Sequence, residues 1–266
     1  MDLFIGASVR GRPMIEIKAG DGHSFSAYRS DPAEPAKGAV VVVQEIFGVN
    51  AHIRKVTDAF AEKGYVGIAP CLFERVAKGV ELGYDEAAIT QGLELANKVG
   101  LENALADIQA TVNAVGNVGK IALVGFDWGA YLAYQAANRV TGLACAIAYY
   151  GCGIADHPFG KRKIPTMLHF GQDDALIPFE WVTNFRSVRP DVTVYGYPAA
   201  HGFACEERDS YNAAAAAAAW DRTLVMISHC LEGPPAVTLK NAGFYASAKV
   251  EKKKKKAAAD DLGPPE

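Results

Sequence analysis

Residues 121–130 read I-A-L-V-G-F-D-W-G-A, and this stretch decides the fold. Ile121–Val124 is a continuous apolar run, which predicts a strand buried on both faces. A helical pattern begins at Ala130, so the G-x-D-x-G pattern places Asp127 at the apex of a sharp strand-to-helix turn. The N-terminus of a helix favours a negative charge, which suits an anionic side chain with a chemical role. The alternative role for Asp127 is simply to cap that helix.

Short apolar runs and amphipathic stretches alternate on both sides of this turn. Alternation of this kind predicts a mostly parallel sheet with helices on both faces. A turn signal at Gly20–Gly22 predicts an antiparallel hairpin at the start of the sheet. The expected strands are Met14–Lys18, Ser24–Arg29, Val40–Val43, Val66–Ala69, Ile121–Val124, Leu143–Tyr149, Thr166–Phe170 and Val192–Tyr197, and the expected helices are His52–Lys63, Glu102–Val115, Ala130–Arg139, Phe179–Val188 and Ser210–Cys230.

The length of 266 residues suits one domain with one core, which we place at residues 1–232. From residue 233 the composition changes to Pro234-Pro235, a lysine run at 252–256 and a polar end. Charge blocks of this kind are usually solvated. We therefore expect residues 233–266 to be a flexible polar tail.

Bulk composition excludes several classes of protein. The formal net charge of -3 and the pI of about 6.1 offer no attractive field to nucleic acid. We find no signal-peptide core and no segment of membrane-spanning length, which predicts a cytoplasmic protein that does not bind membranes. The five cysteines are scattered without a C-x-x-C pair, so we expect neither disulfides nor a metal site. No cofactor is indicated.

Two polar residues follow later strands of the expected sheet and complete a triad with Asp127. Asp173 comes after the strand that ends at Phe170, and His201 comes after the strand that ends at Tyr197. The carboxyl ends of parallel strands form the crevice in which open α/β sheets place their sites. The order nucleophile, acid, histidine is that of the α/β-hydrolase fold. We expect Asp173 to orient His201, which acts as the general base.

The stretch Q-E-I-F-G at residues 44–48 directly follows the early strand Val40–Val43. In this fold an oxyanion hole takes one backbone N–H from such a loop and one from the residue after the nucleophile. The two expected donors are the N–H groups of Ile46 and Trp128.

The chain resembles the dienelactone hydrolases over about residues 15–231. The resemblance rests on V-V-V-V-Q-E-I-F-G-V-N (40–50), P-C-L-F-E-R (70–75), G-Q-D (171–173) and H-G-F-A-C (201–205). It implies the α/β-hydrolase fold and a cytoplasmic, cofactor-free hydrolysis. It also implies that Arg75 contacts a substrate carboxylate and that Glu45 is the glutamate that controls the family's nucleophilic thiol.

Two positions depart from that family pattern. The elbow cysteine of the family is replaced by Asp127, and a second carboxylate-binding arginine is replaced by Cys205, with Arg208 close by. A carboxylate that attacks an ester carbonyl gives an unfavourable mixed anhydride, whereas attack on a saturated carbon gives an ordinary ester. The elbow also resembles the G-x-D-W-G of hydrolytic dehalogenases. We therefore expect a dehalogenase of a small 2-haloacid such as haloacetate, with an ester intermediate on Asp127.

The expected partner is a small carboxylate-bearing substrate. The fork of Arg75 can bind a carboxylate with two hydrogen bonds, although a salt bridge to Glu45 or Glu74 is the alternative use of that side chain. We expect Tyr150 and Phe203 to line the substrate pocket together with Glu45. A homodimer is also possible.

Two other functions stay open at this point. One is the family's own activity, a dienelactone or related ester hydrolase in which Asp127 acts as a base or replaces a natural cysteine. The other is a non-catalytic hydrolase homologue that binds a small carboxylate or a protein partner.

Overall fold

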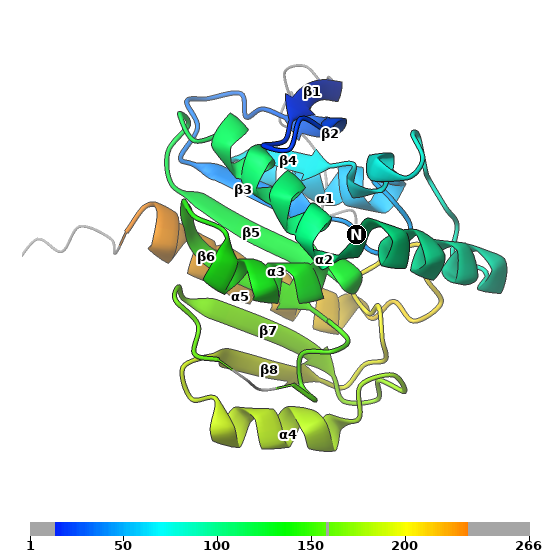
Figure 1. The fold of residues 1–266 in the computed structure, drawn as a ribbon. Coiled ribbons are helices and arrows are strands. Elements are labelled where there is room, and N and C mark those ends of the chain that lie inside the picture. Colours follow the sequence, from blue (N-terminus) through cyan, green and yellow to red (C-terminus); the bar gives the residue numbers. More distant parts are fainter. Residues whose placement is uncertain (1–13, 158–159, 234–266) are drawn as a thin grey trace, which may run out of the picture. The chain divides into compact units, whose positions relative to one another are not determined.

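A computed structural model describes residues 14–157 and 160–233, in which a single eight-stranded sheet forms the centre (Figure 1). The strands lie in the spatial order β1-β2-β4-β3-β5-β6-β7-β8. Their bounds are β1 Met14–Lys18, β2 Ser24–Ser30, β3 Ala39–Val43, β4 Val66–Pro70, β5 Ile121–Phe126, β6 Leu143–Tyr149, β7 Thr166–Gly171 and β8 Thr193–Tyr197.

The first two strands are antiparallel and the rest of the sheet is parallel. β1 pairs with β2, and β2 pairs with β4, in antiparallel ladders. From β4 through β8 every neighbouring pair is parallel, and Val43 of β3 lies opposite Gly125 of β5. The carboxyl ends of β3, β5, β7 and β8 therefore share one edge, where a parallel sheet places its site.

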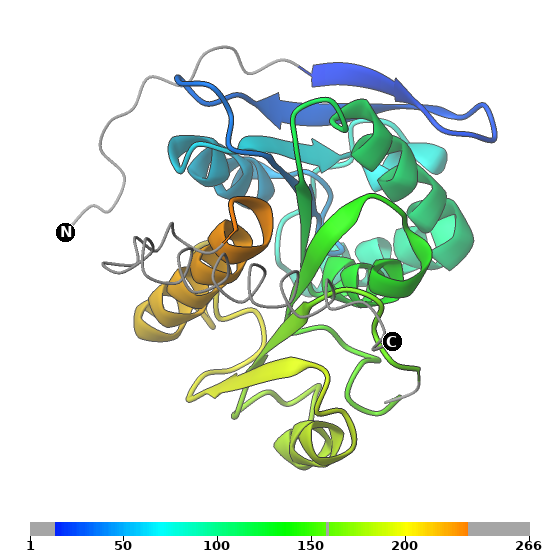
Figure 2. The same cartoon turned by 90° about the vertical axis from the view of Figure 1, so that its left-hand side faces the viewer.

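Helices cover both faces of the sheet, and Figure 2 shows α5 on one side and α2 on the other. The alternation of side chains along β3 explains this, because Val40 and Val42 pack in one cluster with α1 and α5 whereas Val41 and Val43 pack in another with α2 and α3. The helices are α1 Ala51–Glu62, α2 Glu86–Ala114, α3 Trp128–Arg139, α4 Phe179–Val188 and α5 Ala213–Leu231, with the short 3-10 helix η1 at Leu72–Arg75.

The expected α/β-hydrolase architecture is confirmed, and each expected strand and helix is present with ends shifted by a few residues. The exception is α2, which starts at Glu86 rather than at Glu102. Gly100, with φ of 71°, interrupts the helical backbone, so two helical segments join there. The first segment, which contains Gly92, was not predicted from the sequence. Gly92 is required by packing, since a Cβ at this position would lie 2.1 Å from the carbonyl oxygen of Ile46.

The described residues 14–157 and 160–233 all fall within one compact unit. The flexible tail expected at residues 233–266 lies, apart from Gly233, outside the described residues. The single domain at residues 1–232 stays a prediction. Within residues 14–157 and 160–233 we find no helix that is both long enough and apolar enough to cross a membrane.

Candidate active site

Asp127 lies at the turn between β5 and α3 with φ of 50°, a strained backbone for a residue other than glycine. Two glycines permit this turn. A Cβ on Gly125 would lie 1.9 Å from the carbonyl oxygen of Gly129, and one on Gly129 would lie 2.4 Å from that of Gln44. The Asp127 carboxylate makes no capping hydrogen bond to α3. The helix-capping role is therefore wrong, and the side chain is free for another use.

His201 connects two carboxylates that belong to different strand ends. Its Nε2 lies 3.4 Å from Oδ1 of Asp127, and its Nδ1 donates to Oδ2 of Asp174 at 2.8 Å. All three side chains are largely shielded from solvent. The structure thus brings together Asp127, Asp174 and His201, which follow one another along the chain in the order expected for this fold.

The acid beside His201 is Asp174 and not the predicted Asp173. Oδ1 of Asp174 accepts hydrogen bonds from the N–H groups of Leu176 and Ile177 at 2.8 and 3.1 Å, which leaves Oδ2 aimed at the imidazole. Asp173 is exposed, and its backbone N–H donates to the carbonyl of Ala199. The pair of adjacent aspartates made the choice ambiguous in the sequence, because the conformation of the turn decides which of them faces the site.

The two carboxylates determine the charge of the imidazole. Burial by itself lowers the pKa of His201, but the hydrogen bonds with Asp127 and Asp174 more than offset this and raise it to about 9. At neutral pH the histidine is therefore an imidazolium between two aspartates. In this state it can donate a proton, whereas the general-base role expected from the sequence requires the neutral imidazole and stays a prediction.

The loop after β3 lies against the elbow, as the oxyanion-hole prediction requires. The backbone of Gly129 approaches the Gln44 carbonyl so closely that a Cβ would not fit, and the Gln44 side chain accepts a hydrogen bond from the N–H of Leu72 at 3.2 Å. Trp128 is the first residue of α3, so its N–H has no acceptor within the helix. The amides of Ile46 and Trp128 remain the proposed oxyanion donors.

Arg75 does not join this site. Its guanidinium makes two hydrogen bonds to the buried Asp107, at 2.8 and 2.7 Å, and one to Asp21 at 2.7 Å. The predicted substrate contact of Arg75 is therefore not seen, because its donors are taken by carboxylates of α2 and of the β1–β2 turn. The partners also differ from Glu45 and Glu74, which the sequence offered as the alternative.

Arg208 is the arginine that reaches the site. Its Nη1 lies 3.6 Å from Oε1 of Glu45, and its guanidinium packs on Gly202, where a Cβ would approach it to 2.6 Å. Gly202 directly follows His201, so this cation lies next to the catalytic imidazole. The sequence signal was its position seven residues after the histidine, close to where the family pattern has an arginine.

Glu45 and Tyr150 are both completely buried beside the triad, and Phe203 is too. Burial, opposed by Arg208 and reinforced by Asp127, raises the pKa of Glu45 to about 7. The Tyr150 ring lies 5.2 Å from the His201 ring and 5.4 Å from that of Phe203. Tyr150 has φ of 42°, a strain that places its ring against the histidine.

Cys152 is a neighbour that sequence reasoning did not select. Its sulfur lies within 4.8 Å of a carboxylate oxygen of Asp127 and of a ring nitrogen of His201. Burial and the nearby Asp127 raise the pKa of this thiol to about 12, so it stays protonated. Only its position just after β6 could have drawn attention to it.

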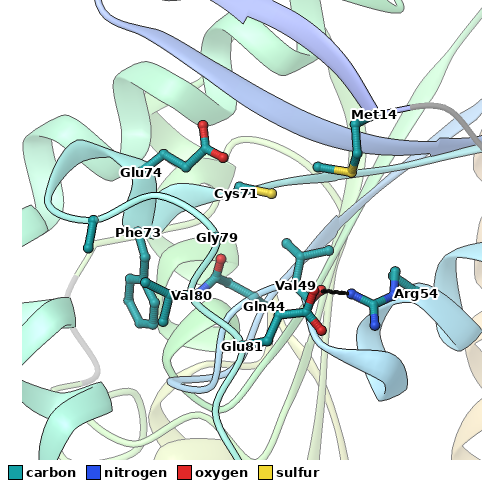
Figure 3. A pocket seen from close by; sticks show the side chains of 11 residues that line it. Met14, Gln44, Val49, Arg54, Cys71, Phe73, Glu74, Gly79, Val80 and Glu81 are labelled. Carbon is teal, nitrogen blue, oxygen red and sulfur yellow. Dashed lines mark hydrogen bonds and ion pairs between the residues drawn. The ribbon is translucent and has the colours of Figure 1, made fainter.

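Gln44 also lines a separate pocket, and Figure 3 shows it with the ion pair between Arg54 and Glu81 among its lining residues. Neither Asp127 nor His201 is among its lining residues. The residues that line it are Met14, Gln44, Val49, Arg54, Cys71, Phe73, Glu74, Ala77, Gly79, Val80 and Glu81. This cavity is therefore separate from the candidate active site.

Residues 25–231 match the Dienelactone hydrolase family. The chain is 36% identical over 219 residues to a Synechocystis protein named "Putative carboxymethylenebutenolidase", covering 74% of this chain and 89% of that one. It is 33% identical over 224 residues to a Pseudomonas "Carboxymethylenebutenolidase", covering 80% and 93%. A Klebsiella pneumoniae crystal structure described as "Putative Dienelactone Hydrolase" aligns with a TM-score of 0.69 and 26% identity, covering 81% of this chain and 98% of that one.

These similarities overturn the haloacetate dehalogenase expected from Asp127. Relatives that align over most of the chain are named for action on a lactone, and nothing in these matches supports a carbon–halogen substrate or an aspartate nucleophile. The error came from giving one side chain more weight than the scaffold around it. The chain belongs to the dienelactone hydrolase family and is a hydrolase.

Proposed function

We propose that the chain hydrolyses small lactones or esters that carry a carboxylate, as the name of its relatives suggests for them. The observation that carries this proposal is the contact of His201 with Asp127 at the elbow on one side and with Asp174 on the other. Its five free cysteines suit a reducing compartment, so the proposal keeps a cytoplasmic location.

Asp127 acts in this proposal as a general base. Its carboxylate takes a proton from a water molecule as the water oxygen attacks the carbonyl carbon of the substrate. This route avoids the mixed anhydride that direct attack by the carboxylate would form. The amides of Ile46 and Trp128 stabilise the negative charge that develops on the carbonyl oxygen.

The protonated His201 acts as the general acid. When the tetrahedral intermediate collapses, the leaving alkoxide takes the proton from the imidazolium, and Asp127 then returns the proton that it took from water. The 3.4 Å separation of the two side chains allows this return. Asp174 keeps the imidazole oriented throughout, through the hydrogen bond at Nδ1. The net reaction consumes one water and regenerates both groups.

Arg208 supplies the charge that binds the substrate carboxylate. It is held by Glu45 at 3.6 Å, a distance too long for a good hydrogen bond. A substrate carboxylate can therefore take the N–H donors of the Arg208 guanidinium, because breaking the long pair with Glu45 costs little free energy. Tyr150 contributes an aromatic wall beside His201, with the two rings 5.2 Å apart.

The test is a ring-opening assay with 4-carboxymethylenebutenolide and with small carboxylated esters, comparing the protein with an Asp127→Asn variant. We expect turnover that the variant loses, and a rate that falls as the pH rises through about 9, because His201 then loses its acidic proton. A rate that instead rises toward pH 9 would indicate that neutral His201 is the base.

An Asp127→Cys variant separates substrate from mechanism. If that variant hydrolyses the lactone and the starting protein does not, Asp127 is not the base, although the substrate class is retained. Absence of turnover in both proteins on every lactone and ester tried contradicts the proposed function as a whole.

A further inference from the structure

Three side chains with metal-binding atoms meet in the protein interior beside the triad. Glu45 follows β3, His52 lies in the first turn of α1, and Cys205 lies in the turn after His201. One ligand atom from each lies within 4.8 Å of the other two. Their exposed fractions are 0%, 4% and 0%, so the cluster is closed to bulk solvent.

The cluster contains polar atoms that the described part of the chain leaves without hydrogen bonds. Both carboxylate oxygens of Glu45 and Nε2 of His52 are buried and have no hydrogen-bond partner there. The nearest compensating charge is Nη1 of Arg208, 3.6 Å from Oε1 of Glu45. The buried hydroxyl of Tyr150 also lies beside Glu45, where it lowers the pKa of that carboxyl. Unsatisfied buried polar groups cost free energy, so three such atoms in one place form a polar lining that a ligand could satisfy.

The chemistry of the three groups indicates the class of ligand. Burial lowers the pKa of His52 to about 4, so its ring is neutral and able to coordinate. A nitrogen, a sulfur and a carboxylate oxygen together suit Zn²⁺ and similar divalent ions, whereas Mg²⁺ and Ca²⁺ require oxygen ligands. Zinc bond lengths place tetrahedral ligand atoms about 3.5 Å apart. The three atoms, which lie within 4.8 Å of one another, therefore need to approach by at most about 1.3 Å.

We propose that Glu45, His52 and Cys205 bind one Zn²⁺-class divalent cation, with a fourth coordination position open to water. Coordination requires Cys205 to release its thiol proton to solvent. It also requires Arg208 to withdraw from Glu45, which its partly exposed side chain allows. This binding site does not depend on the proposed lactone hydrolysis.

Burial and the nearby Glu45 raise the pKa of the Cys205 thiol to about 11, so the cation itself must displace the proton. The Cys205 thiol donates to the hydroxyl of Tyr84 at 3.2 Å, and that hydroxyl also accepts from Nδ2 of Asn50 at 2.9 Å. Once the thiol has lost its proton, the Tyr84 O–H can donate to the sulfur instead. Hydrogen bonds of this kind orient and tune a metal ligand.

The decisive experiment is a Co²⁺ titration of the untagged full chain, followed by the thiolate-to-cobalt charge-transfer absorption. We expect one ion per chain and a band that disappears in Cys205→Ser but remains in Cys152→Ser, the matched control. Competition between Zn²⁺ and a chromophoric chelator should show binding at least tenfold weaker in His52→Gln than in the starting protein. Circular dichroism checks that each variant is folded.

Two outcomes overturn the proposal. One is a starting protein that shows no charge-transfer band and no rise in Tm with Zn²⁺, since a ligand of the folded state must stabilise it. The other is a band that survives in Cys205→Ser and vanishes in Cys152→Ser. That result would place the metal at Asp127, Cys152 and His201 instead.

Discussion

Arg75 and Arg208 are two arginines near carboxylates, and the structure uses them in opposite ways. Arg75 makes three hydrogen bonds of 2.7 to 2.8 Å to Asp107 and Asp21. Within residues 14–157 and 160–233, Arg208 has one ion pair, at 3.6 Å, with Glu45, and its guanidinium lies near the rings of Phe47 and Tyr84. The first guanidinium has its donors occupied and connects α2 to the β1–β2 turn. The second lies beside His201 with donors to spare. The number of occupied donors therefore distinguishes the structural arginine from the one available to a ligand.

The largest effect on catalysis is expected from Asp174, which orients the histidine beside Arg208. Asp174→Asn removes the carboxylate that orients His201 and should lower kcat by about 10⁴-fold, the loss typical of a misoriented catalytic histidine. Steady-state hydrolysis of the lactone measures this. Asp173→Asn is the matched control, because Asp173 is exposed and adjacent in sequence. Equal losses in the two variants would refute the assignment of Asp174.

Removing the hydrogen bonds of Arg75 to Asp107 and Asp21 should lower the free energy of unfolding and not the rate of catalysis. Arg75→Ala leaves the fully buried Asp107 side chain without its partner, which typically costs about 3–5 kcal/mol. Urea unfolding measures the loss. The control is Arg139→Ala, which removes the exposed pair with Glu102 and should cost about 1 kcal/mol or less. If the folded Arg75→Ala protein lost lactone binding, Arg75 would be a substrate residue after all.

Glu45, the partner of Arg208, makes the stability of the folded protein depend on pH. Its pKa is about 7 in the folded protein and ordinarily 4.5, so between these values the folded state holds a proton that the unfolded state has lost. Stability is therefore highest below the lower value and falls as the pH rises through about 7, by about 3 kcal/mol. Chemical unfolding at several pH values should show that Glu45→Gln removes this fall. A variant with an unchanged profile would contradict the assignment.

The smallest effect is expected from Arg208 itself. Arg208→Met should raise KM for carboxylated substrates by about tenfold, which corresponds to one lost charged hydrogen bond. Neutral esters of similar size should be unaffected, and Arg208→Lys should restore part of the binding because it keeps the charge without the fork. Arg186→Met, at an exposed position of α4, is the control. A loss that is equal for neutral esters would show that Arg208 acts through Glu45 alone.

The sequence by itself determined the fold and the family. The apolar runs predicted the parallel strands, because strands buried on both faces need continuous hydrophobic residues, and the turn signal at Gly20–Gly22 predicted the antiparallel pair. The elbow around Asp127 and the position of His201 followed from residues close together in the chain. Asp127 alone, however, misdirected the choice of substrate, since the matching motifs spread over the whole domain carried more information than one substitution.

Only the tertiary structure decided which groups meet. It selected Asp174 over its neighbour because the N–H groups of Leu176 and Ile177 hold one oxygen and direct the other to His201. Arg75 was assigned to Asp107, a residue 32 positions away, and Arg208 was brought to Glu45. Local patterns fix secondary structure, but the pairing of charges depends on distances between segments that are remote in sequence, and those exist only after the chain has folded.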